Sequence, residues 1–139
     1  MAVNKDGVYI AQDKDFQLIG GYWIYKGEPL EVDITNFVNS KNLTDIRYMF
    51  SGLTTYGATP VKRVVLGENS VTNMGSMFRE SQATSLDLSD FDTSSLTSMN
   101  YMFSKSQATI GYARTQADAD KFNSIYGKPT GLNFVVKPR

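Results

Sequence analysis

A short phrase occurs twice between Val71 and Phe103, and this internal repeat constrains the fold more than any other feature. Val71-Thr-Asn-Met-Gly-Ser-Met-Phe78 returns twenty-five residues later as Leu96-Thr-Ser-Met-Asn-Tyr-Met-Phe103. Ser-Gln-Ala-Thr follows both copies, and a weaker copy, Leu43-Thr-Asp-Ile-Arg-Tyr-Met-Phe50, precedes the middle one by twenty-eight residues. A fixed period in the twenties is typical of a solenoid, whose units bury their apolar faces only against their neighbours.

Each phrase predicts a short helix followed by a short strand. The apolar residues recur at i, i+3, i+6 and i+7, so one or two turns of α- or 3₁₀-helix would direct them to one side. The alternation at 86–91 suits a half-buried strand with Leu86 and Leu88 inward and Asp87 and Ser89 outward. In the last unit we expect Gly111 and Ala113 to point outward. The predicted repeat core is Met49, Phe50, Met74, Met77, Phe78, Leu86, Leu88, Met99, Met102 and Phe103.

The repeat also resembles a known family. Val-Thr-Asn-Met-x-x-Met-Phe, followed by Leu-Asp-Leu-Ser-Asp-Phe-Asp-Thr-Ser at 86–94, is similar to the BspA-type repeat of bacterial surface proteins. That leucine-rich-repeat relative also occurs in lipoproteins and phage-encoded proteins, and the resemblance covers about Leu43 to Arg139. It implies an architecture and a tendency toward surface adhesion or recognition, without catalytic residues. The first unit departs from the pattern by an insertion around Tyr56 to Lys62.

The two ends of the chain differ from the repeats and are predicted to cap the array. Before the array, strand patterns at Gly7–Ile10, Phe16–Tyr25 and Leu30–Ile34 predict a small antiparallel β cap. After it, Thr115 is a good N-cap for a helix from about Gln116 to Tyr126. We expect this helix to bury Phe122, Ile125 and Tyr126, and to precede a strand over Leu132–Val136.

Together these patterns predict an α+β fold. It is a short leucine-rich-repeat-like solenoid of about three helix-strand units, with an N-terminal β cap and a C-terminal helix-strand cap. The expected division is an N-terminal β cap and attachment segment at 1–38 and a BspA-like repeat domain with its cap at 39–139.

Composition argues against catalysis and against several partners. The chain has no histidine and no cysteine, which removes the commonest general base, the usual transition-metal ligands and thiolate chemistry. We therefore expect no enzyme, no cofactor and no metal. Fourteen acidic and fourteen basic residues give no net charge, so nucleic acid is not an expected partner. The first residues do not form a signal peptide, and no apolar run is long enough for membrane insertion.

Two clusters permit a second interpretation. Asp87, Asp90 and Asp92 are close enough for a calcium loop, but they lack the EF-hand glycine and glutamate, so a turn-capping role is favoured. Tyr22-Trp-Ile-Tyr25 could stack on a sugar or a single-stranded nucleic acid, but a core or interface strand is the preferred interpretation. Its side chains alternate between two faces that both need cover, which predicts packing against another copy or another protein.

The sequence thus predicts a non-enzymatic structural or binding module. The resemblance favours a phage virion protein of the tail, baseplate or capsid surface, assembled in the host cytoplasm, or a surface adhesion protein. The alternative is an intracellular inhibitor or regulator that binds a host protein through the repeat face, and an enzyme acting on glycans is the third hypothesis. Expected partners are further copies, other virion proteins or a host cell surface. The candidate interface is Tyr22, Trp23, Ile24, Tyr25, Arg63, Asp87 and Ser89.

Overall fold

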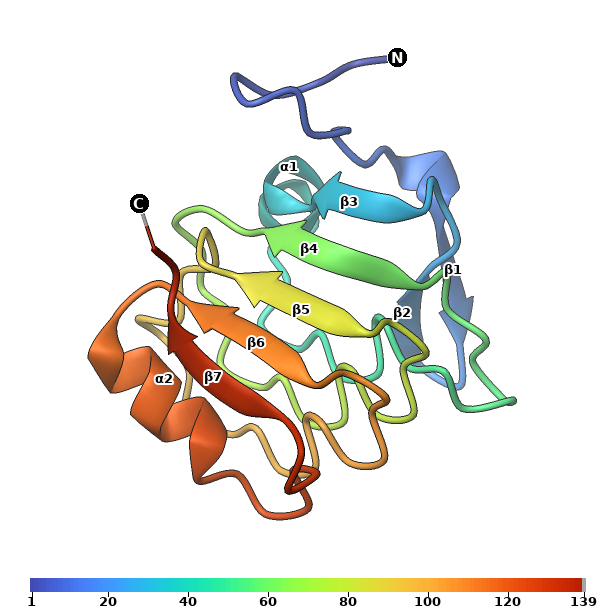
Figure 1. Cartoon of the computed structure of the whole chain (residues 1–139). Helices are drawn as coiled ribbons and strands as arrows, with labels where there is room; N and C mark the ends of the chain where they lie inside the picture. Colours follow the sequence, from blue (N-terminus) through green and yellow to red (C-terminus); the bar gives the residue numbers. More distant parts are fainter. Residues whose placement is uncertain (139) are drawn as a thin grey trace.

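A computed structural model describes residues 1–138 and contains mostly strands, with few helices. Five strands form a parallel sheet in the order β3-β4-β5-β6-β7, and β1 and β2 form a separate antiparallel hairpin (Figure 1). The fold is therefore mixed α/β. In chain order the elements are η1 Asp13–Asp15, β1 Phe16–Ile19, β2 Tyr22–Tyr25, β3 Leu30–Asp33, α1 Thr35–Ser40, β4 Val61–Val65, β5 Ser85–Leu88, β6 Ile110–Ala113, α2 Gln116–Asn123 and β7 Asn133–Val136.

The repeated phrases connect successive strands of the parallel sheet. We name residues 43–52, 71–80 and 96–105 the first, second and third Met-Phe segments. The predicted short helices are wrong, because the segments are runs of turns. Phe50 N donates to Met77 O of the second segment at 3.0 Å, and Phe78 N donates to Met102 O of the third at 2.8 Å. In a helix these amide groups would donate to carbonyl groups of the same segment. Here they join neighbouring segments, which the apolar spacing alone does not reveal.

Left-handed residues make this zigzag path possible. Tyr48, Ser76 and Tyr101 occupy equivalent positions and have φ of 63°, 55° and 58°. Between these bonds to the neighbouring segment, turn bonds such as Met77 N to Met74 O at 3.2 Å form within one segment. Each segment thus alternates between bonds to itself and bonds to its neighbour.

A column of phenylalanines forms the centre of the core. Phe78 stacks on Phe50 at a centroid distance of 5.5 Å and on Phe103 at 5.9 Å. The predicted core is buried except for Met99, which is partly buried against it. In β6, however, Gly111 and Ala113 point inward and not outward. The Phe134 ring lies where a side chain of Gly111 would stand, only 2.5 Å from an added Cβ.

The N-terminal region only partly forms the predicted antiparallel cap. The hairpin β1–β2 is present, but β3 joins β4 in the parallel sheet because α1 and the first Met-Phe segment provide the crossover between them. Residues 7–10 form isolated bridges and no named strand. Ala11 N donates to Asp33 O at 2.9 Å and Asp33 N to Tyr9 O at 2.7 Å, so this segment covers the outer edge of β3.

The insertion predicted in the first unit is an extra turn. Gly57 N donates to Leu53 O at 2.8 Å and closes the turn. Lys26, which follows the hairpin, donates to Tyr56 O at 2.5 Å and to Gly57 O at 2.8 Å. The insertion is therefore tied to the N-terminal hairpin.

The C-terminal helix and strand close the other end of the sheet. Thr115 caps α2 by accepting from Asp118 N, as predicted, but α2 ends at Asn123 and Tyr126 is 78% exposed, so the predicted burial of Tyr126 is wrong. Phe122 is buried against Phe103 and Phe134. Asn123 bonds both Phe134 N and Phe134 O, which satisfies part of the free edge of β7.

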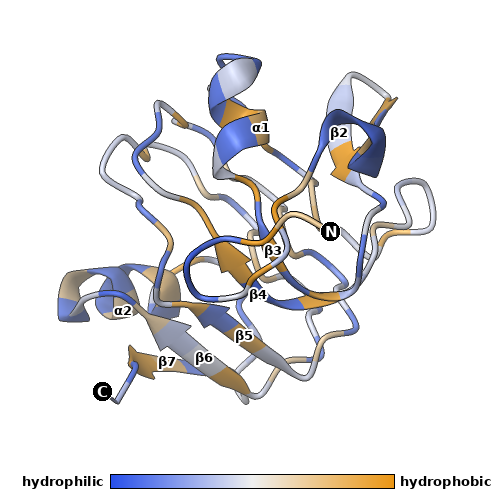
Figure 2. Cartoon of the chain, turned by 90° about the horizontal axis from the view of Figure 1, so that it is seen from above, coloured by the Kyte–Doolittle hydropathy of each residue, from blue (hydrophilic) through white to orange (hydrophobic). Residues whose placement is uncertain are grey.

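Figure 2 shows α2 beside β6 and β7, with α1 and β2 toward the β3 end. Within residues 1–138, neither helix is sufficiently long and apolar to cross a bilayer.

Candidate binding face

The outward side of the parallel sheet carries one side chain per strand in a single row. The register aligns Glu31 with Arg63, Arg63 with Asp87, Asp87 with Tyr112, and Tyr112 with Val135. The first four are half-buried, and Val135 is 43% exposed. We name this row, with the adjacent Lys62, Ser85 and Lys137, the sheet face.

Ion pairs hold the charged members of the sheet face in place. Arg63 bonds Glu31 at 3.3 Å and Asp90 at 2.7 Å. Burial is the largest single influence and would lower the pKa of Arg63, but the bond to Asp90 and the charges of the nearby carboxylates together outweigh it and raise the pKa above its ordinary value. Both acidic partners thus favour the charged guanidinium, and the side chain cannot swing freely.

Asp87 is fixed from two directions. Lys137 Nζ lies 2.6 Å from Asp87 Oδ2, and the Ser89 hydroxyl donates to Asp87 Oδ1 at 2.6 Å. Burial would raise the pKa of Asp87, but these bonds outweigh it and hold the pKa below its ordinary value. Asp87 is therefore ionised at neutral pH and belongs to an organised polar surface.

A shallow hollow of about 250 Å³ lies over this row. Tyr112 and Lys137 line it together with Arg63 and Asp87. Sequence reasoning missed both of them. The register to Asp87 could have identified Tyr112, whereas Lys137 lies fifty residues from Asp87 and outside the repeats.

The structure separates the predicted interface residues. Arg63 and Asp87 lie on the sheet face, but Ser89 is buried below it.

Ile24 and Tyr25 are fully buried and have no surface for a partner. Tyr22 and Trp23 are half-buried in the hairpin, which is not part of the parallel sheet (Figure 1). The chain itself covers β2, because Trp23 packs on Phe37 with centroids 5.6 Å apart and Tyr22 packs on Tyr48 at 4.9 Å.

A larger groove of about 600 Å³ lies beyond the carboxyl ends of β3 and β4, between them and residues 4–10. Asp90 and Asp92 line it. Both have donors: Asp90 bonds Arg63, and Asp92 accepts from Ser94 N at 2.9 Å, which lowers the pKa of Asp92 together with the nearby Arg114. Among residues 1–138 no cluster of three acidic side chains could hold a metal ion. The three aspartates at 87–92 thus pair with donors of the protein.

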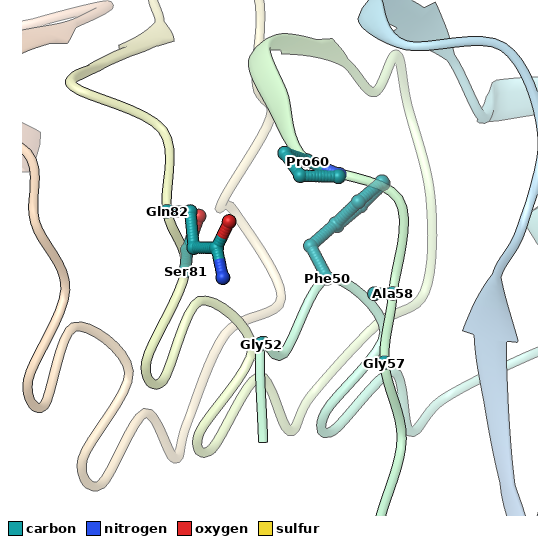
Figure 3. A pocket seen from close by; sticks show the side chains of 7 residues that line it. All are labelled: Phe50, Gly52, Gly57, Ala58, Pro60, Ser81 and Gln82. Atoms are coloured by element: carbon teal, nitrogen blue, oxygen red, sulfur yellow. The ribbon is translucent and has the colours of Figure 1, made fainter. Parts of the chain in front are cut away.

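A third hollow, of about 190 Å³, marks the place where the insertion interrupts the regular packing. Figure 3 shows Gln82 and Ser81 facing Phe50 and Pro60 across it. Between the second and third units, Gln107 N donates to Ser81 O at 3.0 Å. In the first unit the chain bends back instead, with Ala58 N donating to Ser51 O at 3.0 Å. The hollow therefore results from the inserted turn.

Asp87 and Asp92 are poorly suited to act as general acids. The pKa of Asp87 and of Asp92 is lowered, whereas a general acid needs a raised pKa. Paired charges on a rigid sheet can present hydrogen-bond partners in fixed positions.

The fold defines a small mixed α/β protein with a parallel sheet. The family model described as "Mycoplasma protein of unknown function, DUF285" matches residues 24–124, more than half of the chain, and the chain belongs to this family. No curated protein and no solved structure matches it.

Proposed function

We propose that this chain is a non-enzymatic structural or binding module, built as a short leucine-rich-repeat-like solenoid of about three units of the BspA type. The stacked Met-Phe segments and the strands between them support this proposal, because each unit packs mainly on its neighbours. The family match, which lies in the broad context of repeat-containing surface proteins, supports it further.

One observation carries the binding role. The row from Glu31 to Val135 presents one side chain per strand, and Arg63 and Asp87 are held by ion pairs. A surface whose side chains are already ordered loses little conformational entropy on binding. We assign the protein partner to the sheet face, where Tyr112 and Arg63 are of the residue types that most often dominate protein interfaces.

The partner is proposed to be a protein of a particle or a cell surface. A virion component of the tail, baseplate or capsid surface, or a surface adhesion protein, would use such a face to attach or to recognise a host. Further copies of the chain belong to the same class of partner. An inhibitor or regulator that binds a host protein inside the cell is the alternative, supported by the same ordered face.

Site-specific photo-cross-linking tests the role and its location together. A photoreactive amino acid replaces Tyr112 on the sheet face, and the control places it at Tyr126, an exposed tyrosine outside that face. We expect position 112 to cross-link to a particle or surface protein. We also expect the cross-linked chain to be accessible to protease added to intact cells or purified particles. If position 112 cross-links only to proteins inside the cell, and added protease cannot reach the cross-linked chain, the inhibitor or regulator is favoured. No protein cross-link at 112 beyond that at 126 would reject the sheet face as the interface.

A further inference from the structure

A further recessed surface lies on the Met-Phe segments and not on the sheet face. It is a notch of about 230 Å³ that spans all three segments. We name it the tyrosine notch, and its lining residues are Arg47, Tyr48, Asn73, Gly75, Ser76, Ser98, Asn100 and Tyr101.

The notch exists because the middle segment carries small residues. Tyr48, Ser76 and Tyr101 occupy equivalent positions, as do Arg47, Gly75 and Asn100. Tyr48 N donates to Gly75 O at 3.3 Å and Ser76 N to Asn100 O at 2.9 Å, so the segments are spaced like neighbouring strands. Two such spacings place the two tyrosine backbones about 10 Å apart, with Gly75 and Ser76 between them.

Tyrosine is an unexpected choice at these positions. Tyr48 and Tyr101 have φ of 63° and 58°, a left-handed conformation that glycine or asparagine adopts at lower cost. Tyr101 is nevertheless 43% exposed, so burial does not offset that cost. Tyr48 is half-buried, so Tyr101 is the exposed aromatic side chain on a left-handed backbone, and this outlier motivates a surface role for the notch.

Neighbouring side chains hold the rings before any ligand arrives. Tyr48 packs against Tyr22 and Tyr56 with centroids 4.9 and 4.6 Å away. The guanidinium of Arg79 lies 5.5 Å from the centroid of the Tyr101 ring, and Tyr126 meets that ring edge-on. Both walls of the notch are therefore pre-organised.

The chemistry of the lining favours a neutral, hydroxyl-rich ligand. Among the lining residues the one charged side chain is Arg47, and Asp45 matches its charge at 2.8 Å, so the lining itself offers no unpaired charge to a charged ligand. Side-chain amides and hydroxyls of Asn73, Asn100 and Ser98 provide both donors and acceptors. Aromatic walls offer an apolar face beside these polar groups, and a pyranose ring has apolar C–H faces and a polar rim of hydroxyls.

The volume limits the size of the bound group. Pockets that enclose drug-sized ligands measure roughly 300–1,000 Å³, and the notch, at about 230 Å³, is smaller. We propose that the tyrosine notch binds a single neutral sugar ring of a glycan chain, with the rest of the chain in solvent. This inference rests on the proposed role as a binding module but not on the sheet face.

The test is a titration of the full chain, followed by amide chemical shifts, with the neutral trisaccharides of glucose, mannose and N-acetylglucosamine. We expect at least one of them to shift the amides of Gly75, Ser76, Asn100 and Tyr101 at or below about 10 mM, in the weak-affinity range. Tyr101→Ala is expected to weaken this binding at least tenfold. If Tyr101→Ala does not fold, Asn100→Trp, an exposed position, fills the notch and is expected to have the same effect.

The matched control is Tyr112→Ala on the sheet face, which should leave the sugar titration unchanged. Conversely, Tyr101→Ala should leave the cross-links from position 112 unchanged, so the two proposals fail separately. The sugar proposal is overturned if none of the three trisaccharides shifts the notch amides, or if Tyr101→Ala and Tyr112→Ala weaken binding equally. It is also overturned if cross-linking places a protein partner in the notch.

Discussion

Phe50 and Phe78 lie 28 residues apart in sequence, yet their rings stack with centroids 5.5 Å apart and planes 9° from parallel. Phe103 continues the column on the other side of Phe78, 5.9 Å away. Phe78 is therefore enclosed by an equivalent residue on each side, and its exposed fraction is 0%. The stability of the stacked segments depends on such contacts between units.

Phe78→Ala is expected to lower the free energy of unfolding by about 3–5 kcal/mol, the usual cost of removing a buried aromatic ring. Thermal unfolding measures it. Phe78→Leu is the matched control, which retains most of the buried volume and should cost less than half as much. A melting temperature only a degree or two below that of the wild type would show that Phe78 does not act as a core residue.

Gly52→Ala should disrupt the contact between the first and second Met-Phe segments. A Cβ at Gly52 would lie 2.0 Å from the carbonyl oxygen of Glu80, so the backbone must shift. We expect a loss of about 1–3 kcal/mol or more, as in other overpacked sites. Gly131→Ala is the control, since no atom lies within 4 Å of an added Cβ there. Denaturant unfolding that gives equal stabilities for both variants would contradict this packing.

The Asp87–Lys137 pair should make stability depend on acid pH. The pKa of Asp87 is lowered in the folded state, so its contribution is present above the unfolded pKa of about 3.9 and is lost as pH falls through the folded value. Urea unfolding between about pH 6 and pH 2 should therefore show a smaller acid loss in Asp87→Asn. Lys137→Met should reduce the loss similarly, because it removes the partner. An acid dependence unchanged in both variants would show that the pair is not formed in solution.

Tyr9 should make stability depend on alkaline pH. Its hydroxyl donates to Asp15 at 2.6 Å, and this bond, with burial and the charge of Asp15, raises the pKa of Tyr9 to about 12. A raised folded pKa contributes stability below the unfolded value of about 10, and that stability is lost as pH rises toward the folded one. Tyr9→Phe should show a smaller alkaline loss of unfolding free energy than the wild type. Ultraviolet titration that places every tyrosine near its ordinary pKa would refute the bond.

The sequence predicted the core well because the repeat marks equivalent positions. Phe50, Phe78 and Phe103 are each in the same place in their segments. The same period, counted from Leu86 and Leu88, leads to Gly111 and Ala113, which are inward in the structure. The contrary prediction followed the hydrophobicity of Ile110 and Tyr112 instead.

The turns and the face were harder to predict. Apolar residues at i, i+3 and i+7 fit both a helix and a run of turns, and only the bonds to the next segment distinguish them. Tyr25 was assigned to an interface because no local pattern reveals that Phe16 and Phe50 cover it. Lys137 approaches Asp87 only after β7 joins the sheet, so no local spacing predicts that pair.

The bonds of the middle Met-Phe segment bear on how such a gene can change. Ile46 N donates to Asn73 O, and Met74 N donates to Ser98 O, so the middle segment meets the first and the third through the same kind of bond. Residues 71–78 and 96–103 also share a threonine, two methionines and a phenylalanine at matching positions. Unequal recombination between them would delete or duplicate twenty-five codons in frame. We therefore expect related genes to differ in the number of units and to retain both ends intact.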